Sequence, residues 1–267
     1  MISVIMSVYN ADKYLRESIE SILNQTFTNF EFIIINDAST DNSLKIIEEY
    51  KKKDKRIILI SNENNAGLAS SLNLGIKQSK YDFIARMDAD DISEPERLEK
   101  QLGFLLDNKH IDILGTFASI IDEDGEITAK QKMPLSHYEI VKMLVKLNPI
   151  IHPTIIFRKM ALNRINFYNP KFSQNAPEDY ELWFRAVKSG LIFYNLPEYL
   201  IRYRINNSHL SRKNLSFRVN EFKIRLKGYK LLKVSFYKYI YLFIPLILGI
   251  APAALYHRLK TNDPRQG

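Results

Sequence analysis

The amino-acid sequence predicts an α/β fold in which a mostly parallel β-sheet is flanked by helices on both faces. Three observations favour this class. Short apolar runs alternate with helical patterns along the first hundred residues, 46% of the 267 residues are apolar, and no internal repeat or low-complexity tract interrupts the pattern. Such alternation is typical of βαβ units, in which neighbouring strands run parallel. The apolar content is sufficient for one large buried core.

The N-terminal elements are predicted to follow one another as strand, helix, strand and helix. The apolar runs SVIMSV, FEFIII, IILIS and YDFIARM are the predicted strands. Between them apolar residues fall at helical spacing, as Leu15, Ile19 and Ile22 do. A further helix is expected to begin near Ser93, because Ser93 and Glu96 have the spacing of a capping box. Ligands of such a sheet bind beyond the carboxyl ends of its strands.

The pattern changes after residue 110. The run IDILGTFASII, a DEDG turn and a short return strand predict an antiparallel pair. Further along, EDYELWFRAV followed by Gly190 predicts a helix that ends at a glycine. A basic helix is predicted from Arg212 to Lys233, and it leads into the apolar run YIYLFIPLILGIAPAALY.

Charge is unevenly distributed along the chain. The net charge is +8, but residues 202–267 hold 14 Lys and Arg against Glu221 and Asp263, so this part carries +12 and the remainder carries −4. A basic segment attracts either nucleic acid or an anionic membrane surface. Here the basic residues are interleaved with long apolar runs, so we expect a membrane surface and no nucleic acid.

The first residues, MISVIMSVYN, have no basic leader and no small-residue cleavage site, so we interpret them as a strand and not as an export signal. Cysteine is absent, which excludes disulfides, thiolate metal sites and a cysteine nucleophile. We therefore expect the protein in the cytoplasm, associated with the inner face of the cell membrane.

Polar residues follow the first, second and fourth predicted strands, and these strand ends should face one crevice. They include Tyr9, Asp37 and the run DADD at 88–91. On an extended segment Asp88 and Asp90 would project the same way and offer oxygen ligands to Mg²⁺ or Mn²⁺. Taken alone, such a triplet is more often a turn or a helix cap, and the same holds for NDASTD around Asp37. The order of both acidic stretches within one α/β half favours a site.

Five ordered blocks resemble the family 2 glycosyltransferases, over roughly residues 1–210. The blocks are SVYNADKYLRESIESILNQTF, FEFIIINDASTDNS, NNAGLASSLNLGI, IARMDADDI and PEDYELWFR. Each block is weak alone, whereas their order is specific. The resemblance implies a GT-A-like, Rossmann-related fold and an inverting transfer of a sugar from a nucleotide diphosphate sugar to a hydroxyl group. UDP is favoured over dTDP and GDP as the nucleotide.

The resemblance also implies which residues bind the base of the nucleotide. Ser7, Tyr9, Asn10 and Asp37 would lie at the nucleobase. A carboxylate such as that of Asp37 suits the ring N–H of uracil or thymine.

Other residues are expected at the nucleotide and the donor sugar. The resemblance places Asn65 and Gly67 in the nucleotide pocket, where glycine allows the backbone to approach the ligand closely. An ordinary turn before a helix is nearly as good an interpretation of these two. Arg86 would reach phosphate or sugar, and Asp88 with Ala89 would lie near the ribose or donor sugar.

The resemblance places the metal ion, Mg²⁺ or Mn²⁺, on Asp90 together with Asp88. Family members often carry a histidine after the YR pair near the end of the catalytic domain, and here YRINNSHLS has Asn206 instead. His209 is therefore a candidate third ligand from a shifted loop. Alternatively the contact is missing, and the diphosphate relies on Arg204 and Arg212.

An acidic pair at a helix start completes the predicted site. Asp179 resembles the general base of the family, with Glu178 as an orienting partner, whereas helix capping is the structural alternative. Trp183, one helical turn further on, is a candidate platform for the acceptor sugar, and core packing is equally compatible. His152 is more simply explained as shaping a turn before Pro153.

We divide the chain into a catalytic domain, 1–210, and a basic and apolar helical tail, 211–267. Within the catalytic domain, 1–110 is the nucleotide-binding half and 111–210 the acceptor-binding half. From residue 239 to 256 no residue carries a formal charge, but Pro245, Gly249 and Pro252 do not favour a straight membrane span. We expect residues 212–260 to lie on a membrane surface, with a homodimer interface as the alternative.

The predicted function is therefore an inverting sugar transfer to a glycan or lipid-linked oligosaccharide acceptor, in the synthesis of a surface polysaccharide. A nucleotidyltransferase that makes activated sugars would also use paired carboxylates, but its Gly-rich basic loop is missing from SVYNADKYL. A catalytically silent membrane-bound scaffold is the non-enzymatic alternative.

Overall fold

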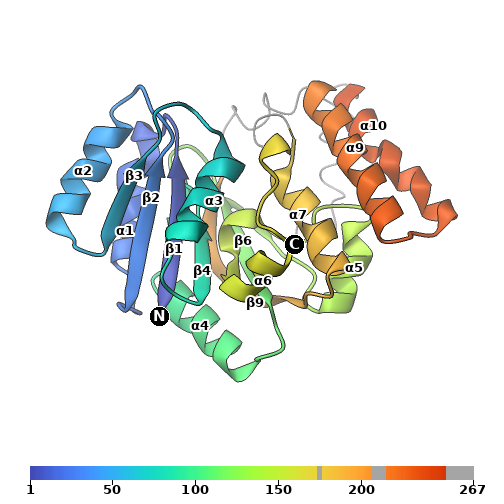
Figure 1. The fold of residues 1–267 in the computed structure, drawn as a ribbon, viewed down its shortest axis with the longest axis horizontal. Helices are drawn as coiled ribbons and strands as arrows, with labels where there is room; N and C mark the ends of the chain where they lie inside the picture. Colours follow the sequence, from blue (N-terminus) through green and yellow to red (C-terminus); the bar gives the residue numbers. More distant parts are fainter. Residues whose placement is uncertain (173–175, 206–214, 251–267) are drawn as a thin grey trace.

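The computed structural model describes residues 1–172, 176–205 and 215–250 of the chain. One mixed β-sheet runs through the molecule, with helices on both of its faces (Figure 1). The predicted α/β class with flanking helices is therefore confirmed.

The boundaries of the described elements are as follows. The strands are β1 (Ile2–Val8), β2 (Phe30–Asn36), β3 (Ile57–Ser61), β4 (Phe83–Met87), β5 (Ile92–Ser93), β6 (Ile113–Ile121), β7 (Ile127–Gln131), β8 (Ile156–Arg158) and β9 (Phe193–Arg204). The α-helices are α1 (Asp12–Leu23), α2 (Ser43–Lys53), α3 (Leu68–Gln78), α4 (Arg97–Asp107), α5 (His137–Leu144), α6 (Lys159–Arg164), α7 (Glu178–Lys188), α9 (Leu215–Leu231) and α10 (Ile244–Ile250). Three 3₁₀ segments complete the description: η1 (His152–Thr154), η2 (Pro170–Phe172) and η3 (Phe236–Phe243).

The strand order is β3-β2-β1-β4-β8-β6-β9-β5, and β7 pairs with the outer part of β6. The first four strands in this order are parallel, as the βαβ pattern predicts. Beyond them the sheet is mixed, because β8 is antiparallel to both β4 and β6, whereas β9 is parallel to β6. The predicted antiparallel pair is β6 with β7, joined by a turn too short for a crossover.

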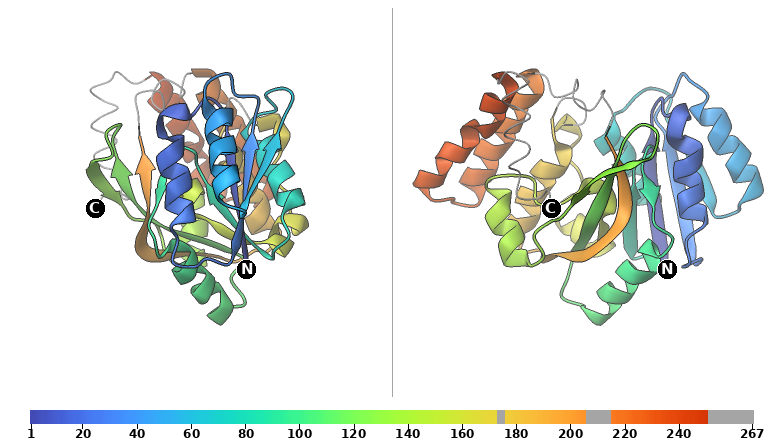
Figure 2. Two further views of the ribbon diagram at one scale, coloured as in Figure 1. Left: turned by 90° about the vertical axis from the view of Figure 1, so that its left-hand side faces the viewer. Right: turned by 180° about the vertical axis from the view of Figure 1, so that it is seen from behind.

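The two faces of the sheet carry separate apolar cores. Alternate side chains of a strand point to opposite faces, so Val4 and Met6 pack with α1, α2 and α4, while Ile5 packs with α3. The core on the α3 face continues into α5, α6, α7 and α9. Figure 2 shows the helices on either side of the sheet.

One helix start differs from the prediction. Helix α4 begins at Arg97 and not near Ser93, because Ser93 belongs to the short strand β5. The Ser93 hydroxyl accepts a hydrogen bond from Gln25 Nε2 at 3.1 Å, and it caps no backbone N–H. The predicted capping box between Ser93 and Glu96 is therefore wrong, since pairing of the strand with β9 takes this residue out of the helix.

Helix α9 packs directly on helix α7. Ile224 and Tyr229 are buried in the core that also holds Phe184, and Arg225 Nη1 donates to the backbone oxygen of Lys146 at 2.7 Å. The predicted boundary at residue 210 falls outside the described residues and stays a prediction. Over residues 1–172, 176–205 and 215–250, none of the helices has the length and apolar character needed to cross a membrane.

Replacing Gly228 with Ala is expected to destabilise the protein by about 1–3 kcal/mol. A Cβ at this position would lie 2.3–2.5 Å from ring atoms of the buried Phe184, so α9 would have to move away from α7. The free energy of unfolding, measured with urea, checks this. Gly103→Ala in α4 is the matched control: nothing lies within 4 Å of its Cβ, and we expect a gain of about 0.5–1 kcal/mol. Equal effects of the two changes would contradict the described packing.

Candidate active site

The carboxyl ends of β1, β2 and β4 meet at one edge of the sheet, because β1 lies between the other two and all three are parallel. The loops that follow β1 and β2 are hydrogen-bonded to each other. The backbone N–H of Asp37 donates to Val8 at 2.8 Å, and Asn10 Oδ1 accepts from the N–H of Thr40 at 2.8 Å. Asn10 has a φ of 49°, a left-handed conformation that asparagine tolerates better than most residues. The loops after β1 and β2 therefore meet at the sheet edge where the crevice was predicted.

Asp37 is buried and holds the loop that leads into α3. Its two carboxylate oxygens accept hydrogen bonds from the Asn62 side chain at 2.7 Å and from the N–H groups of Ala66 and Gly67 at 2.9 and 2.8 Å. Gly67 has a φ of 82°, which favours glycine. Asp37 therefore fixes the backbone next to Asn65, which is exposed.

The remaining residues predicted at the nucleobase line the same edge. Ser7 is half-buried near the end of β1, and Tyr9 is 50% exposed directly after it. Base contacts of these two residues stay predictions.

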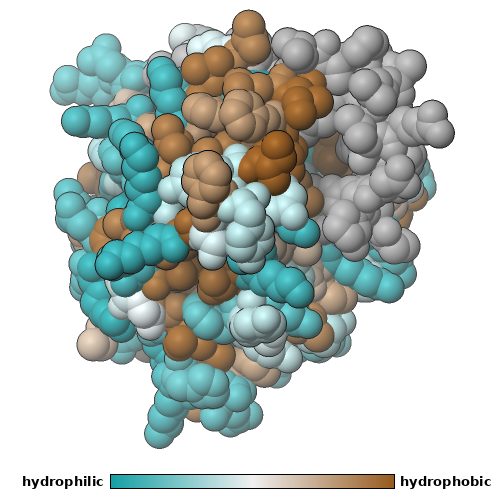
Figure 3. All heavy atoms as spheres, turned by 90° about the vertical axis from the view of Figure 1, so that its right-hand side faces the viewer, coloured by the Kyte–Doolittle hydropathy of each residue, from teal (hydrophilic) through white to brown (hydrophobic). Residues whose placement is uncertain are grey.

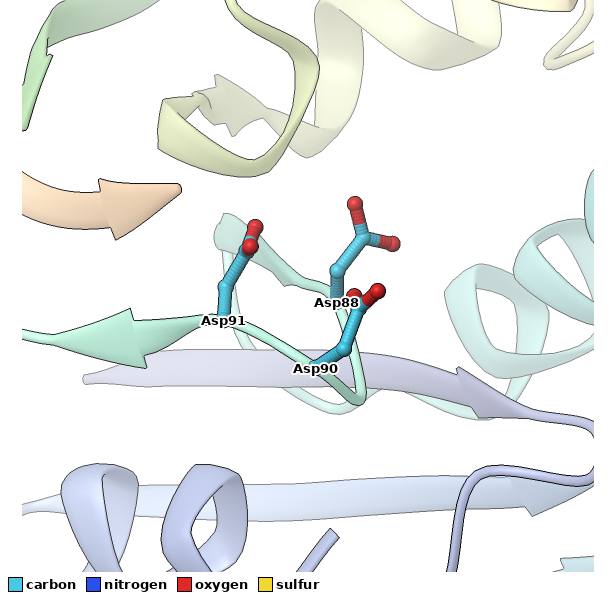
Figure 4. Close-up of side chains that lie close together, drawn as sticks. All are labelled: Asp88, Asp90 and Asp91. Carbon is cyan, nitrogen blue, oxygen red and sulfur yellow. The ribbon is translucent and has the colours of Figure 1, made fainter. Parts of the chain in front are cut away.

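Three carboxylates lie together where β4 ends. One oxygen each of Asp88, Asp90 and Asp91 can be chosen so that all lie within 4.8 Å of one another, and Figure 4 shows the three side chains clustered on the loop between β4 and β5. The segment was predicted to be extended, but the chain turns at residues 89 and 90. This turn brings Asp91 into the cluster, whereas Ala89 is buried in the apolar core.

Arg86 lies beneath this cluster. Its side chain is only 4% exposed, and both of its terminal nitrogens donate to the carboxylate of Asp88. The guanidinium is therefore directed at Asp88, in place of the predicted contact with phosphate or sugar. A buried cation at this position partly compensates the negative charge of the cluster.

Asp91 is the most deeply buried member of the cluster. Its Oδ1 accepts from the backbone N–H of Arg204 at 2.8 Å, and its Oδ2 is buried without a hydrogen-bond partner. Burial raises the pKa of Asp91 well above its usual range, and the negative charges of Asp88 and Asp90 raise it further. A buried carboxylate oxygen without a donor beside two other carboxylates is the donor set that Mg²⁺ or Mn²⁺ prefers.

Arg204, at the end of β9, holds this loop in place. Its side chain is 1% exposed. It donates from Nε to the backbone oxygen of Asp90 at 2.8 Å and from Nη1 to that of Asp122 at 2.8 Å, and it pairs with Glu17 at 2.7 Å. The alternative in which Arg204 binds the diphosphate is therefore wrong for this conformation, because all three of its nitrogens are used within the protein.

Arg212, the other residue of that alternative, lies outside the described residues, and so does His209, the candidate third metal ligand. Their predicted contacts with the metal and the diphosphate stay predictions.

The predicted acidic pair opens helix α7, as expected. Asp179 Oδ2 accepts from the Asn148 side chain at 2.6 Å, and its Oδ1 accepts from the N–H of Tyr180 at 2.7 Å. Burial raises the pKa of Asp179, and the Asn148 hydrogen bond opposes this. Burial also raises the pKa of Glu178, from 4.5 to about 8, with the charge of Asp179 as the next cause. At neutral pH Glu178 is therefore mainly protonated.

Glu178 faces a buried histidine. The Nδ1 of His152 lies 3.8 Å from Glu178 Oε1, and its Nε2 lies 2.7 Å from the Tyr168 hydroxyl. Burial and the charge of Arg86 lower the pKa of His152 well below its usual value. His152 is therefore a neutral neighbour of a protonated Glu178, and the two form no ion pair at neutral pH.

The raised pKa of Glu178 predicts a pH-dependent stability. Between pH 4.5 and about 8 the folded protein keeps a proton that the unfolded chain has released, so the free energy of unfolding falls as pH rises through this window. Glu178→Gln has no proton to lose. We therefore expect its stability relative to the wild type to increase by about 2–4 kcal/mol from the acid to the alkaline end of the window. Thermal unfolding across pH checks this, and parallel curves for the two proteins would contradict the raised pKa.

Trp183 is part of the core and not of the acceptor surface. Its side chain is 0% exposed, it stacks on Phe157 with ring centroids 6.0 Å apart, and it meets the edge of Phe193 at 5.9 Å. The predicted acceptor platform is therefore wrong for this structure, because the indole has no free face. The alternative of core packing is the one that the structure shows.

Four residues of the site were missed or given little weight from sequence alone. They are Asp91, Asn148, His152 and Arg204. Arg204 was considered only as a diphosphate contact and His152 only as a turn residue, while Asn148 carried no signal. Only Asp91, the fourth residue of DADD, stood in a motif considered for the metal. The others act across large sequence separations, such as 31 positions from Asn148 to Asp179. Arg86, Asp88 and Asp179 all influence the pKa of Glu178, so the acidic cluster and the acidic pair share one electrostatic environment.

The parallel half of the sheet, with an acidic cluster beyond the ends of its strands, has the arrangement in which α/β folds bind their ligands. Residues 3–165 match the family described as Glycosyl transferase family 2. The chain belongs to this family, and it is a glycosyltransferase. This finding decides against the nucleotidyltransferase alternative.

Named relatives cover nearly all of the chain. It is 36% identical to a putative glycosyltransferase, EpsE, of Bacillus subtilis, over 100% of this chain and 96% of that protein. It is 39% identical to the O-antigen biosynthesis glycosyltransferase WbnJ of Escherichia coli, over 81% of this chain and 84% of the relative.

Solved structures share the fold. The structure of residues 1–349 of TarS from S. aureus in complex with UDP-GlcNAc matches with a TM-score of 0.63 and 21% identity, over 94% of this chain and 81% of that one. The mannosyltransferase PcManGT from Pyrobaculum calidifontis, in complex with GDP-Man and Mn²⁺, matches with a TM-score of 0.62 and 14% identity, over 97% of this chain and 78% of that one. These likenesses confirm the GT-A-like fold.

Proposed function

We propose that the enzyme transfers a sugar from a nucleotide diphosphate sugar, with UDP as the first candidate, to a hydroxyl of a glycan or lipid-linked acceptor in surface polysaccharide synthesis. The observation that carries this proposal is the convergence of Asp88, Asp90 and Asp91 beside the acidic pair at the start of α7. The UDP-GlcNAc complex of TarS and the O-antigen role in the name of WbnJ support the choice of donor and pathway.

The acidic cluster fits a divalent cation. Asp88 and Asp90, with the buried Oδ2 of Asp91, would hold Mg²⁺ or Mn²⁺. Bound there, the cation would supply Lewis acidity that neutralises negative charge on the leaving diphosphate. The Mn²⁺ in the PcManGT complex supports this proposal. Arg86 and Arg204 orient the carboxylates and the loop that carries them.

Asp179 is the proposed general base. As the acceptor oxygen forms its bond to the anomeric carbon, the bond from that carbon to the diphosphate oxygen breaks, and the hydroxyl proton moves to Asp179. Asn148 and the N–H of Tyr180 hold the Asp179 carboxylate. Because Glu178 is mainly protonated at neutral pH, Asp179 is the member of the pair proposed to accept the proton. Attack from the face opposite the leaving group gives inversion at the anomeric carbon.

Calorimetric titration with UDP, dTDP and GDP, each with and without Mn²⁺, tests the proposed donor site. We expect one nucleotide to bind, with an affinity that falls at least about tenfold without Mn²⁺ or in Asp90→Ala. Asp124→Ala, at an exposed turn residue, is the control and should bind as the wild type does. If none of the nucleotides binds, the proposed donor site is wrong.

The cytoplasmic location predicted from the sequence stays a proposal, which fractionation of cells would test. A homodimer likewise stays a proposal, which sedimentation velocity would test.

A further inference from the structure

A stripe of apolar side chains faces solvent at the C-terminal end of the described chain. On η3 and α10, Phe236, Tyr237, Ile240, Phe243 and Ile247 are 88%, 73%, 66%, 49% and 51% exposed. Apart from the adjacent Phe236 and Tyr237, they follow one another at spacings of three or four residues, so they lie along one side of this segment. Figure 3 shows apolar side chains gathered on this face of the molecule. We call these five residues the apolar stripe.

The segment beneath the stripe is anchored in the protein. Leu242 is 3% exposed and belongs to the core on the α7 side of the sheet. The ring of Tyr239 meets that of the buried Tyr229 edge-on at 5.4 Å, and Arg225 Nη1 of α9 donates to the backbone oxygen of Tyr241 at 3.4 Å. One side of η3 and α10 is thus packed on α9, and the apolar stripe is the side left facing solvent.

The segment that carries the stripe is positively charged. Residues 215–250 contain seven Lys and Arg and a single acidic residue, Glu221. Glu221 is buried between Arg218 and Arg225 and pairs with both. The exposed charges of α9 and the following turn come from lysines, namely Lys223, Lys227, Lys230 and Lys233. Within residues 215–250, every exposed charged side chain is therefore a cation.

We propose that the apolar stripe and the lysines of α9 form a docking surface for an anionic lipid bilayer. Aromatic and aliphatic side chains enter the interface between headgroups and acyl chains, and the lysines pair with anionic headgroups. The proposal goes beyond sugar transfer, because it concerns where the enzyme is held and not what it catalyses.

Charge decides against a second copy of this chain as the occupant. In a two-fold symmetric dimer the same patch faces itself, so the lysines of one copy would meet those of the other. The stripe also decides against nucleic acid, because aliphatic residues such as Ile240 and Ile247 offer no contact to phosphates. An anionic bilayer satisfies both the apolar and the cationic part of the surface.

Vesicle flotation of the full-length protein tests the docking surface. Vesicles containing phosphatidylglycerol are compared with vesicles of phosphatidylcholine alone. We expect the wild type to float with the anionic vesicles, and the variant Ile240→Ser/Phe243→Ser/Ile247→Ser to lose about 10- to 100-fold in partition coefficient. The matched control is Ile127→Ser/Tyr138→Ser/Met160→Ser, which changes equally exposed apolar residues elsewhere. It should float as the wild type does.

A second pair of variants tests the contribution of the lysines to binding of the anionic vesicles. Lys223→Glu/Lys230→Glu is expected to reduce flotation about tenfold and to remove most of its dependence on salt. Lys51→Glu/Lys52→Glu, with two exposed lysines of α2, is the control. Circular dichroism and thermal unfolding verify that each variant is folded.

Several outcomes would overturn the proposal. They are no flotation of the wild type, equal flotation of wild type and stripe variant, or a dimer in sedimentation velocity that only the stripe variant loses. The last result would assign the stripe to a second copy. Nucleotide binding by calorimetry is independent of all these measurements, so a failure of the docking surface is distinguishable from a failure of the proposed transferase site.

Discussion

Replacing Asp90 with Asn is expected to lower kcat by about 10³-fold, corresponding to about 4 kcal/mol of lost transition-state stabilisation. The change keeps the shape of the side chain and removes one negative charge from the cluster with Asp88 and Asp91. The backbone oxygen of residue 90 still accepts from Arg204, so the loop keeps its anchor. Initial rates of sugar transfer, measured over a range of Mn²⁺ concentrations, check this prediction.

The matched control for this change is Asp124→Asn, at an exposed turn between β6 and β7. It should keep wild-type activity at every Mn²⁺ concentration. In Asp90→Asn, added Mn²⁺ should restore part of the rate, because the remaining carboxylates still attract the cation weakly. A variant that is as active as the wild type at low Mn²⁺ would show that the cluster is not the metal site.

The second large effect is expected at the start of α7. Asp179→Asn should lower kcat by about 10²- to 10⁴-fold, the usual contribution of a general base. Its affinity for the donor nucleotide should stay unchanged, because the proposed base acts on the acceptor hydroxyl and not on the nucleotide. Single-turnover rates together with calorimetric titration of the nucleotide measure the two quantities separately.

Glu178→Gln is the partner experiment, since glutamine imitates the protonated state that Glu178 holds at neutral pH. We expect its kcat to lie within about tenfold of the wild type. If Glu178→Gln instead loses more activity than Asp179→Asn, the two residues exchange roles, and Glu178 is the base.

Much of the fold follows from local sequence pattern. Strands β1 and β2 are long apolar runs, and helix α1 buries Leu15, Ile19 and Ile22 as its spacing predicts. The error at Ser93 has a tertiary cause, because pairing with β9, more than a hundred residues away, decides that this residue is a strand. The mixed second half of the sheet was likewise not predictable, since strand direction there depends on long-range pairing.

The acidic residues of the site could be predicted from the sequence, but the residues that hydrogen-bond to them could not. Asp88, Asp90 and Asp179 stand in motifs, whereas the bond from Asn148 to Asp179 is visible only in the folded chain. Trp183 shows the limit of spacing arguments. Its position one turn after Asp179 is compatible with either face of α7, and packing against Phe157 turns it inward.

The close contact between Phe184 of α7 and Gly228 of α9 links the helix that carries the proposed base to the helix that supports the apolar stripe. Helix α7 begins at the proposed base and carries Phe184 on the side that touches α9, and α9 in turn supports η3 and α10. If a bilayer holds the apolar stripe, Asp179 stays at a fixed height above the lipid, because packed helices and not a flexible linker set that height. Only acceptors whose hydroxyl reaches this height would then be glycosylated. The distance between the lipid anchor and the reacting hydroxyl of an acceptor would therefore determine whether it is a substrate.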